Sequence, residues 1–83
     1  MSNAVLVDTG PLVAILSVKD LHHSACVEAL SQIPRNAPLL TCWPVVTEAA
    51  WLLRKQASGM LNLLACLDGK RMSVIPLDSN AVP

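Results

Sequence analysis

An uninterrupted apolar run that ends in an acid, a glycine and a proline most limits how this chain can fold. The residues Ala4–Val7 are apolar at every position and are followed by Asp8, Thr9, Gly10 and Pro11. An apolar run without alternation is typical of a parallel strand covered on both faces. Gly10 and Pro11 end the strand, and proline is favoured at the first position of a helix. We therefore expect a central strand with Asp8 at its carboxyl end, where α/β sheets bind ligands.

Two further apolar segments predict strands, and the segments between the strands have helical spacing. The predicted strands are 39–41 and 72–75. The first two predicted helices are 11–18 and a helix that is capped by Asp20 and extends to Ile33. The other two are 42–55 and 60–67, with a break at Ser58 and Gly59 between them. Gly69 suits the end of the last of these helices, and Asp78 with Ser79 resembles the start of another. Strands that alternate with helices indicate an α/β fold with a parallel sheet.

The composition bears on size and on partners. The chain has 83 residues, enough for one domain, and 53% of them are apolar while 14% are charged. A short chain cannot bury so much apolar surface, so we expect either a larger sheet whose remainder follows Pro83 or a protein partner. The formal net charge is zero, so a bound cation would have to supply any attraction for a nucleic acid.

The apolar segments and the cysteines point to the cytoplasm. No apolar segment has the length of a membrane span, and the N-terminus lacks the basic region of a signal peptide. Cys26, Cys42 and Cys66 are odd in number and widely spaced in apolar surroundings. This pattern favours reduced core thiols over a disulfide framework.

Glu48 is the second acid that the pattern singles out. It falls in the helix that follows the second predicted strand, so we expect it near the same sheet edge as Asp8. The residues three and four positions away are all apolar: Pro44, Val45, Trp51 and Leu52. A carboxylate on such a face is costly unless it is paired or bound to a cation. Two converging carboxylates favour Mg²⁺ or Mn²⁺, which prefer oxygen ligands.

Structural alternatives exist for each of these residues. Asp8 can instead form a local turn with the backbone of Thr9 and Gly10. Glu48 can pair with a basic residue, or it can face solvent; the basic residues in question are Arg54, Lys55 and Arg71. His22 and Cys26 are four residues apart and offer half of a zinc site, but no second pair with ligand spacing exists.

These motifs resemble the PIN domain. The segment 5–16, which reads VLVDTGPLVAIL, is similar to the opening of that family, and the segment 20–26 resembles its second helix. The segments 38–41 and 46–53 resemble the second strand and the helix with the second acid. The family has one or two further acids after its third strand, and neither Asp68 nor Asp78 is equivalent to them. The resemblance thus implies one PIN-like domain over 1–83, incomplete at its C-terminus.

The resemblance also implies a function. PIN domains have a three-layer, Rossmann-like fold, and many are Mg²⁺-dependent ribonucleases like VapC, the toxin of type II toxin–antitoxin pairs. By this likeness Asp8 and Glu48 would be metal-binding catalytic acids, with Thr9 a polar neighbour, and the cofactor would be Mg²⁺ or Mn²⁺. RNA would be the substrate, an antitoxin the protein partner and a cytoplasmic homodimer the assembly. A different class is an inactive PIN remnant that acts as a protein-binding or dimerisation module. A third is an unrelated α/β fragment with a structural Asp8.

Overall fold

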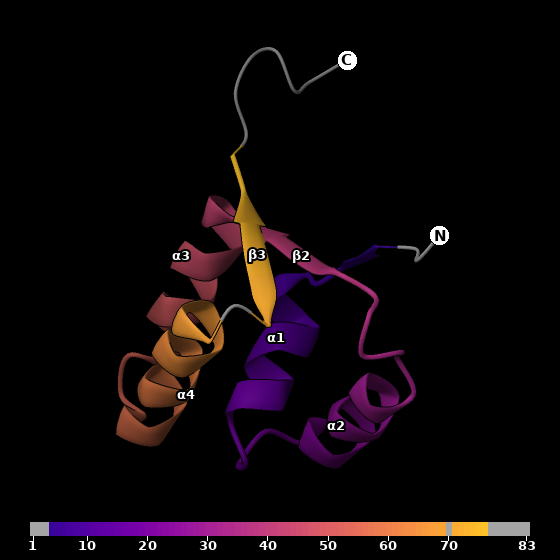
Figure 1. Cartoon of the computed structure of the whole chain (residues 1–83). Coiled ribbons are helices and arrows are strands. Elements are labelled where there is room, and N and C mark those ends of the chain that lie inside the picture. Colours follow the sequence, from indigo (N-terminus) through magenta and orange to yellow (C-terminus); the bar gives the residue numbers. More distant parts are fainter. Residues whose placement is uncertain (1–3, 70, 77–83) are drawn as a thin grey trace.

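A computed structural model describes residues 4–69 and 71–76 (Figure 1). The predicted helix start at Asp78 and Ser79 lies outside these residues. In chain order the elements are β1 (Val5–Leu6), α1 (Thr9–Leu16), α2 (His23–Ser31), β2 (Leu39–Cys42), α3 (Trp43–Leu53), α4 (Ala57–Asp68) and β3 (Met72–Ile75). No helix in the described part of the chain is both long enough and apolar enough to span a membrane.

The three strands form one parallel sheet in the order β1-β2-β3. Val5, Leu39 and Met72 are neighbours in the register, so their side chains share one face of the sheet. This face packs against the helices, and Leu39 and Met72 are buried there. The predicted α/β architecture with a parallel sheet is therefore confirmed.

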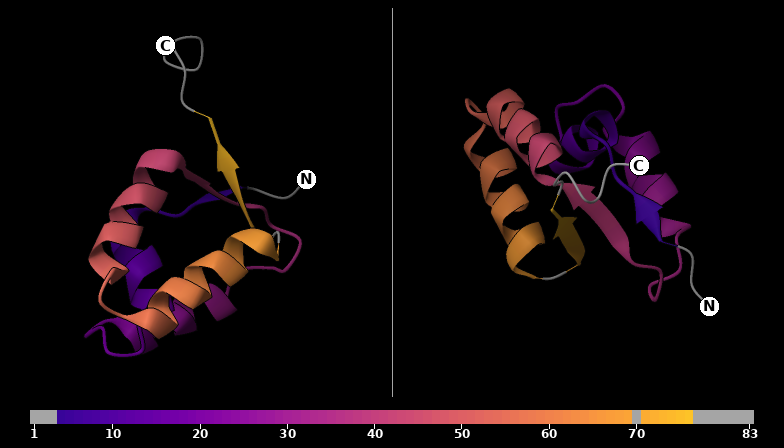
Figure 2. Two further views of the ribbon diagram at one scale, coloured as in Figure 1. Left: turned by 90° about the vertical axis from the view of Figure 1, so that its left-hand side faces the viewer. Right: turned by 90° about the horizontal axis from the view of Figure 1, so that it is seen from above.

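The opposite face of the sheet carries Leu6, Leu40 and Ser73, which are also neighbours in the register. Leu6 and Ser73 are exposed, and Leu40 is half-buried. The right-hand view of Figure 2 shows the helices gathered on one side of the sheet. Among the described residues the fold thus has two layers, and the third layer stays a prediction.

The position of β1 differs from the prediction. The apolar run predicted a central strand buried on both faces, but β1 lies at the edge of the three described strands. The Leu6 side chain is 74% exposed. An apolar run indicates that a strand is hydrophobic, but it does not indicate how many strands pair with it. Here β2 is the strand with a partner on each side, so the prediction was wrong for the described sheet.

The first helix begins earlier than predicted. α1 starts at Thr9, with Asp8 as its N-cap, and Pro11 occupies the third helical position instead of the first. Proline is tolerated there because the first N–H groups of a helix have no partner within the helix. The next helix begins later than predicted, at His23, because the Asp20 carboxylate accepts the His22 N–H and forms a turn before it.

Ser58 and Gly59 do not break the chain, as the sequence had suggested. Both lie in the first turn of α4, which starts at Ala57. Gly59 is buried, and a Cβ atom placed on it would lie 2.8 Å from Cδ2 of Leu53. Leu53 at the end of α3 is fully buried. The glycine is therefore a packing residue that lets α4 approach α3 closely.

The hydrophobic core surrounds α1, which contacts α2, α3 and α4. Its central buried residues are Leu12, Leu16, Leu39, Ala49, Leu53, Leu63 and Met72. They come from α1, β2, α3, α4 and β3, so one cluster joins both halves of the chain. Removing a buried leucine from such a core costs about 2–5 kcal/mol.

Hydrogen bonds hold the carboxyl end of α1. The Ser17 hydroxyl donates to Oε1 of Gln56 at 2.6 Å, and Nδ2 of Asn62 donates to the Leu16 carbonyl at 3.1 Å. On the other side, Nδ1 of His23 donates to the Ala14 carbonyl at 2.7 Å. The last carbonyls of a helix lack partners within it. The bonds from Asn62 and His23 supply partners for two of these carbonyls. They also fix the direction of α1, which begins at Asp8.

The close packing at Gly59 generates the first prediction. Gly59→Ala will lower the free energy of unfolding by about 1–3 kcal/mol, because the added Cβ forces Cδ2 of Leu53, a fully buried side chain, to shift within the core. Gly10→Ala is the matched control, since nothing lies within 4 Å of its added Cβ. That variant will be neutral or more stable by up to about 1 kcal/mol. Urea denaturation measures both, and equal effects would contradict this account of Gly59.

Candidate functional site

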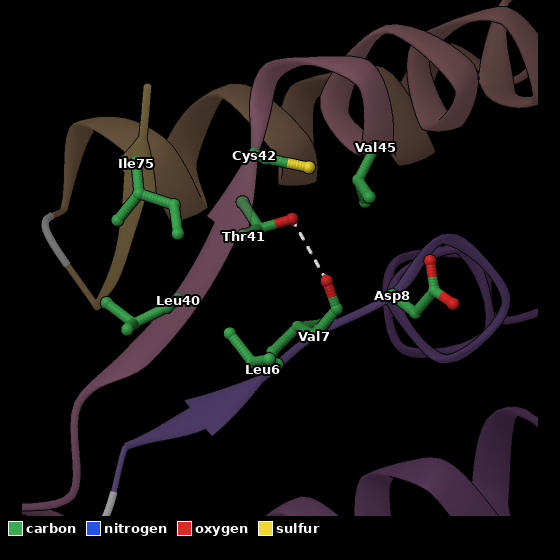
Figure 3. Close-up of a pocket in the computed structure, with 8 residues that line it drawn as sticks. All are labelled: Leu6, Val7, Asp8, Leu40, Thr41, Cys42, Val45 and Ile75. Atoms are coloured by element: carbon green, nitrogen blue, oxygen red, sulfur yellow. Dashed lines mark hydrogen bonds between the residues drawn. The ribbon is translucent and has the colours of Figure 1, made fainter. Parts of the chain in front are cut away.

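Asp8 lies where the chain passes from the sheet into the first helix. It follows β1 in extended conformation, with φ −90° and ψ 173°, and it caps α1. One carboxylate oxygen accepts the N–H of Thr9 at 2.8 Å. In Figure 3 the carboxylate lies over the first turn of α1. A negative charge is favourable there because it faces the positive end of the helix dipole. The local backbone contact that the sequence offered as an alternative is therefore present.

Asp8 also lines a cleft of about 320 Å³ at the carboxyl edge of the sheet (Figure 3). The lining residues are Leu6, Val7, Asp8, Leu40, Thr41, Cys42, Val45 and Ile75. They come from the ends of all three strands and from the first turn of α3. Asp8 is the one charged residue among them. The predicted position of Asp8 between the end of a strand and the start of a helix is seen in the structure.

Thr41 was missed by the sequence analysis. Its side chain is 3% exposed, and its hydroxyl donates to the carbonyl of Val7 at 3.0 Å. Val7 directly precedes Asp8, and its own N–H donates to the Leu40 carbonyl at 2.8 Å. These two bonds attach the end of β1 to β2 and so place the Asp8 backbone. A threonine in an otherwise apolar strand was the available signal.

Glu48 has a different environment from the one predicted. It lies on α3 and is exposed, and it is absent from the lining of the cleft. Its apolar neighbours Trp51 and Leu52 are themselves 62% and 49% exposed. The prediction that its carboxylate lies on a buried apolar face, with the free-energy cost that burial brings, was therefore wrong. Of the structural alternatives, solvent exposure agrees with the structure.

Glu48 is nevertheless one helical turn from the cleft. Val45, three residues before it, lines the cleft, and α3 begins directly after β2 ends. Thr9, by contrast, is buried and does not line the cleft, so its side chain is a part of the packing. Asp8 and Glu48 thus come from neighbouring strand–helix junctions at the same edge, one inside the cleft and one beside it.

The donor chemistry of this edge suits a hard cation. Mg²⁺ is commonly held by one or two carboxylates, with water and substrate oxygens as the other ligands. Asp8 and Glu48 are both exposed, so neither has to be desolvated in the free protein. Within 4–69 and 71–76 no group of three or more His, Cys, Asp or Glu residues gathers around one point. The same result leaves His22 and Cys26 without further partners for zinc in that part of the chain.

No family model, no curated protein and no solved structure matches this chain. What the site does must therefore be argued from its own residues.

The bond between Thr41 and Val7 generates the second prediction. Thr41→Val will lower the free energy of unfolding by about 1 kcal/mol, because it removes the buried donor and keeps the shape of the side chain. Thr47→Val is the matched control, since Thr47 is exposed on α3 and the two residues have similar helix propensity. Thermal denaturation compares them. An equal response of both variants would show that the hydroxyl of Thr41 adds no stability.

Proposed function

We propose that this chain belongs to a PIN-type, metal-dependent ribonuclease that hydrolyses RNA phosphodiester bonds. The observation that carries the proposal is the exposed carboxylate of Asp8 in a cleft at the carboxyl edge of a parallel sheet. Ligands bind at this edge in open α/β folds. The DTG and TEA motifs around Asp8 and Glu48, which resemble those of PIN domains, add to it.

The charges of the site require a cation for this function. Both acids repel a phosphodiester, and the chain has six basic and six acidic residues, so no net positive charge offsets the repulsion. Asp8 and Glu48 would hold Mg²⁺ or Mn²⁺ between the protein and the phosphate. When bound, the cation supplies Lewis-acid chemistry, which activates water and stabilises charge on the phosphate.

The residues of the chain have defined tasks in this proposal. The Thr9 N–H holds one oxygen of Asp8, which leaves the second oxygen for a ligand. The bond from Thr41 to the Val7 carbonyl attaches the end of β1 to β2, which fixes the backbone directly before Asp8. Asp8 is the one charged residue that lines the cleft, and the other lining residues are neutral. Glu48 on α3 would supply the second carboxylate for the cation.

The biological setting that we propose is a toxin–antitoxin pair in the cytoplasm. The toxin would act as a homodimer and bind an antitoxin protein through apolar contacts. Large apolar side chains exposed in the structure support such contacts, among them Leu61 at 65% and Leu64 at 57% on α4. Exposed apolar groups of this kind are common at protein interfaces.

A second function of a different class has its own observation. A cleft of about 210 Å³ between α1, α2 and β1 is lined by apolar side chains that include Ile15, Leu30 and Ile33. Such a cleft suits an apolar segment of a partner. If the chain binds no metal, this cleft and the exposed face of α4 favour a catalytically inactive module for protein binding or dimerisation.

A Mn²⁺ titration by calorimetry tests the proposed function. Asp8→Asn and Glu48→Gln will each weaken binding by more than about tenfold, because each removes one charged ligand and little volume. Asp68→Asn, at the exposed end of α4, is the control and will bind like the parent chain. If neither variant weakens binding, the two acids do not share a metal.

Cleavage of RNA extends the same test to the chemistry. The Asp8→Asn variant will fold normally but will not cleave RNA in Mn²⁺. Circular dichroism checks the fold beside the cleavage assay. Cleavage at the parent rate by a folded Asp8→Asn variant would refute the catalytic role of Asp8.

Sedimentation tests the proposed dimer. The chain will self-associate, and Leu64→Lys will shift it toward the monomer because a charge in an apolar interface is costly. Leu21→Lys is the control, since Leu21 is 91% exposed in the turn between α1 and α2. A parent chain that stays monomeric at high concentration would count against both the homodimer and the dimerisation module.

A further inference from the structure

Both tryptophans of the chain lie on the outer side of α3. The sequence has two tryptophans and neither tyrosine nor phenylalanine, so these indoles are its only large aromatic rings. Trp43 is 57% exposed and Trp51 is 62% exposed. Tryptophan is on average a highly buried residue, and its burial would contribute more than that of most side chains. A fold that leaves both indoles in solvent has not used them for its core.

The spacing of the two indoles places them along one stripe of the helix. Trp43, Thr47, Trp51 and Arg54 follow one another at intervals of four, four and three residues, which brings them onto adjacent turns of the same side. Thr47 and Arg54 are exposed as well. Eight residues of α-helix separate the two tryptophan positions by about 12 Å along the helix axis. We call these four residues the α3 stripe.

Arg54 gives the stripe a fixed positive charge. Its guanidinium carbon lies 3.8 Å from the centre of the Trp51 ring, and its Nη1 donates to the Trp51 carbonyl at 2.7 Å. These contacts hold the arginine beside the indole. Lys55 follows directly and is exposed. One end of the stripe therefore combines an aromatic ring with two cations.

We propose that the α3 stripe binds single-stranded RNA, with bases stacked on Trp43 and Trp51 and phosphates near Arg54 and Lys55. The inference rests on the proposed function, because Glu48 lies beside Thr47 and needs a cation before a phosphate can pass it. Aromatic rings with neighbouring positive charge are how proteins bind single strands without reading their sequence. The stripe would lead the strand past Glu48 toward the cleft.

The spacing of the two tryptophan positions favours a single strand. Stacked nucleotides rise by about 3.4 Å each, whereas the two tryptophan positions are about 12 Å apart along the helix axis, so the spacing does not match two neighbouring bases of a stacked helix. In a single strand the bases can turn outward and stack on separate side chains. The paired bases of a duplex present only their edges to such a surface.

The polar members of the stripe favour RNA over a protein partner. Tryptophan and arginine also occur at the centres of protein interfaces, where apolar contacts surround them. Here Thr47 lies between the indoles, and the cations Arg54 and Lys55 are exposed at the end. The charges of Arg54 and Lys55 complement a phosphate backbone.

Tryptophan fluorescence measures this binding directly, because no other aromatic ring contributes to the emission. The probes are a short oligouridylate and the same strand annealed to oligoadenylate, each titrated in Mn²⁺ and in chelator. In Trp43→Leu and Trp51→Leu the remaining indole reports binding. Each variant will bind the single strand about 5- to 150-fold more weakly than the parent chain. The duplex will quench much less.

Conservative variants separate stacking from folding. Trp43→Phe and Trp51→Phe keep a ring and will recover most of the affinity that the leucine variants lose. Arg54→Gln will weaken binding and reduce its dependence on salt, because it removes one contact with phosphate. Leu21→Ala is the control, since Leu21 is an exposed apolar residue in the turn between α1 and α2, away from the α3 stripe. It will bind RNA like the parent chain.

Each outcome decides between the hypotheses. The inference is overturned if Trp43→Leu and Trp51→Leu both bind RNA as tightly as the parent chain. It is also overturned if the emission changes with protein concentration in the absence of RNA, because the indoles would then face a second copy of the chain. A normal Mn²⁺ titration without quenching by RNA overturns the inference and leaves the proposed function standing. A chain that binds no Mn²⁺ but is quenched by RNA in chelator, through both indoles, supports RNA binding by the α3 stripe. The same result refutes the metal-dependent nuclease.

Discussion

The burial of α1 between the sheet and the other helices is the interaction on which the rest of this structure depends. Leu12 and Leu16 of this short helix pack with residues from β2, α3, α4 and β3 in one core cluster. Hydrogen bonds from Asn62 and His23 then hold its carboxyl end from both sides. A helix of eight residues is unstable in isolation, so these contacts supply the stability that it lacks.

The same helix places the site, because its first turn begins directly after β1. Asp8 caps that turn, and the buried hydroxyl of Thr41 holds the preceding carbonyl of Val7. The position of the carboxylate is therefore determined from two sides, by a packed helix and by a neighbouring strand. Glu48 is positioned more loosely, as an exposed residue on the second turn of α3. This difference makes Asp8 the more informative residue for testing the proposed metal site.

Exposed residues of different chemistry lie on α3 and on α4. The α3 stripe carries aromatic rings with cations, while Leu61 and Leu64 on α4 are exposed without a charge between them. The first combination suits a nucleic acid and the second a protein. A chain that cleaves RNA and is held by a protein partner needs both kinds of surface.

The sequence by itself determined the order and type of the elements, because apolar periodicity and the Gly-Pro break depend on local chain geometry. It also placed Asp8 at the end of a strand and Glu48 in the helix after the next strand. Only the tertiary structure decided that β1 lies at an edge of the described sheet, that Gly59 packs against Leu53, and that Glu48 faces solvent. Neighbours from distant parts of the chain set these properties, and no local pattern records them.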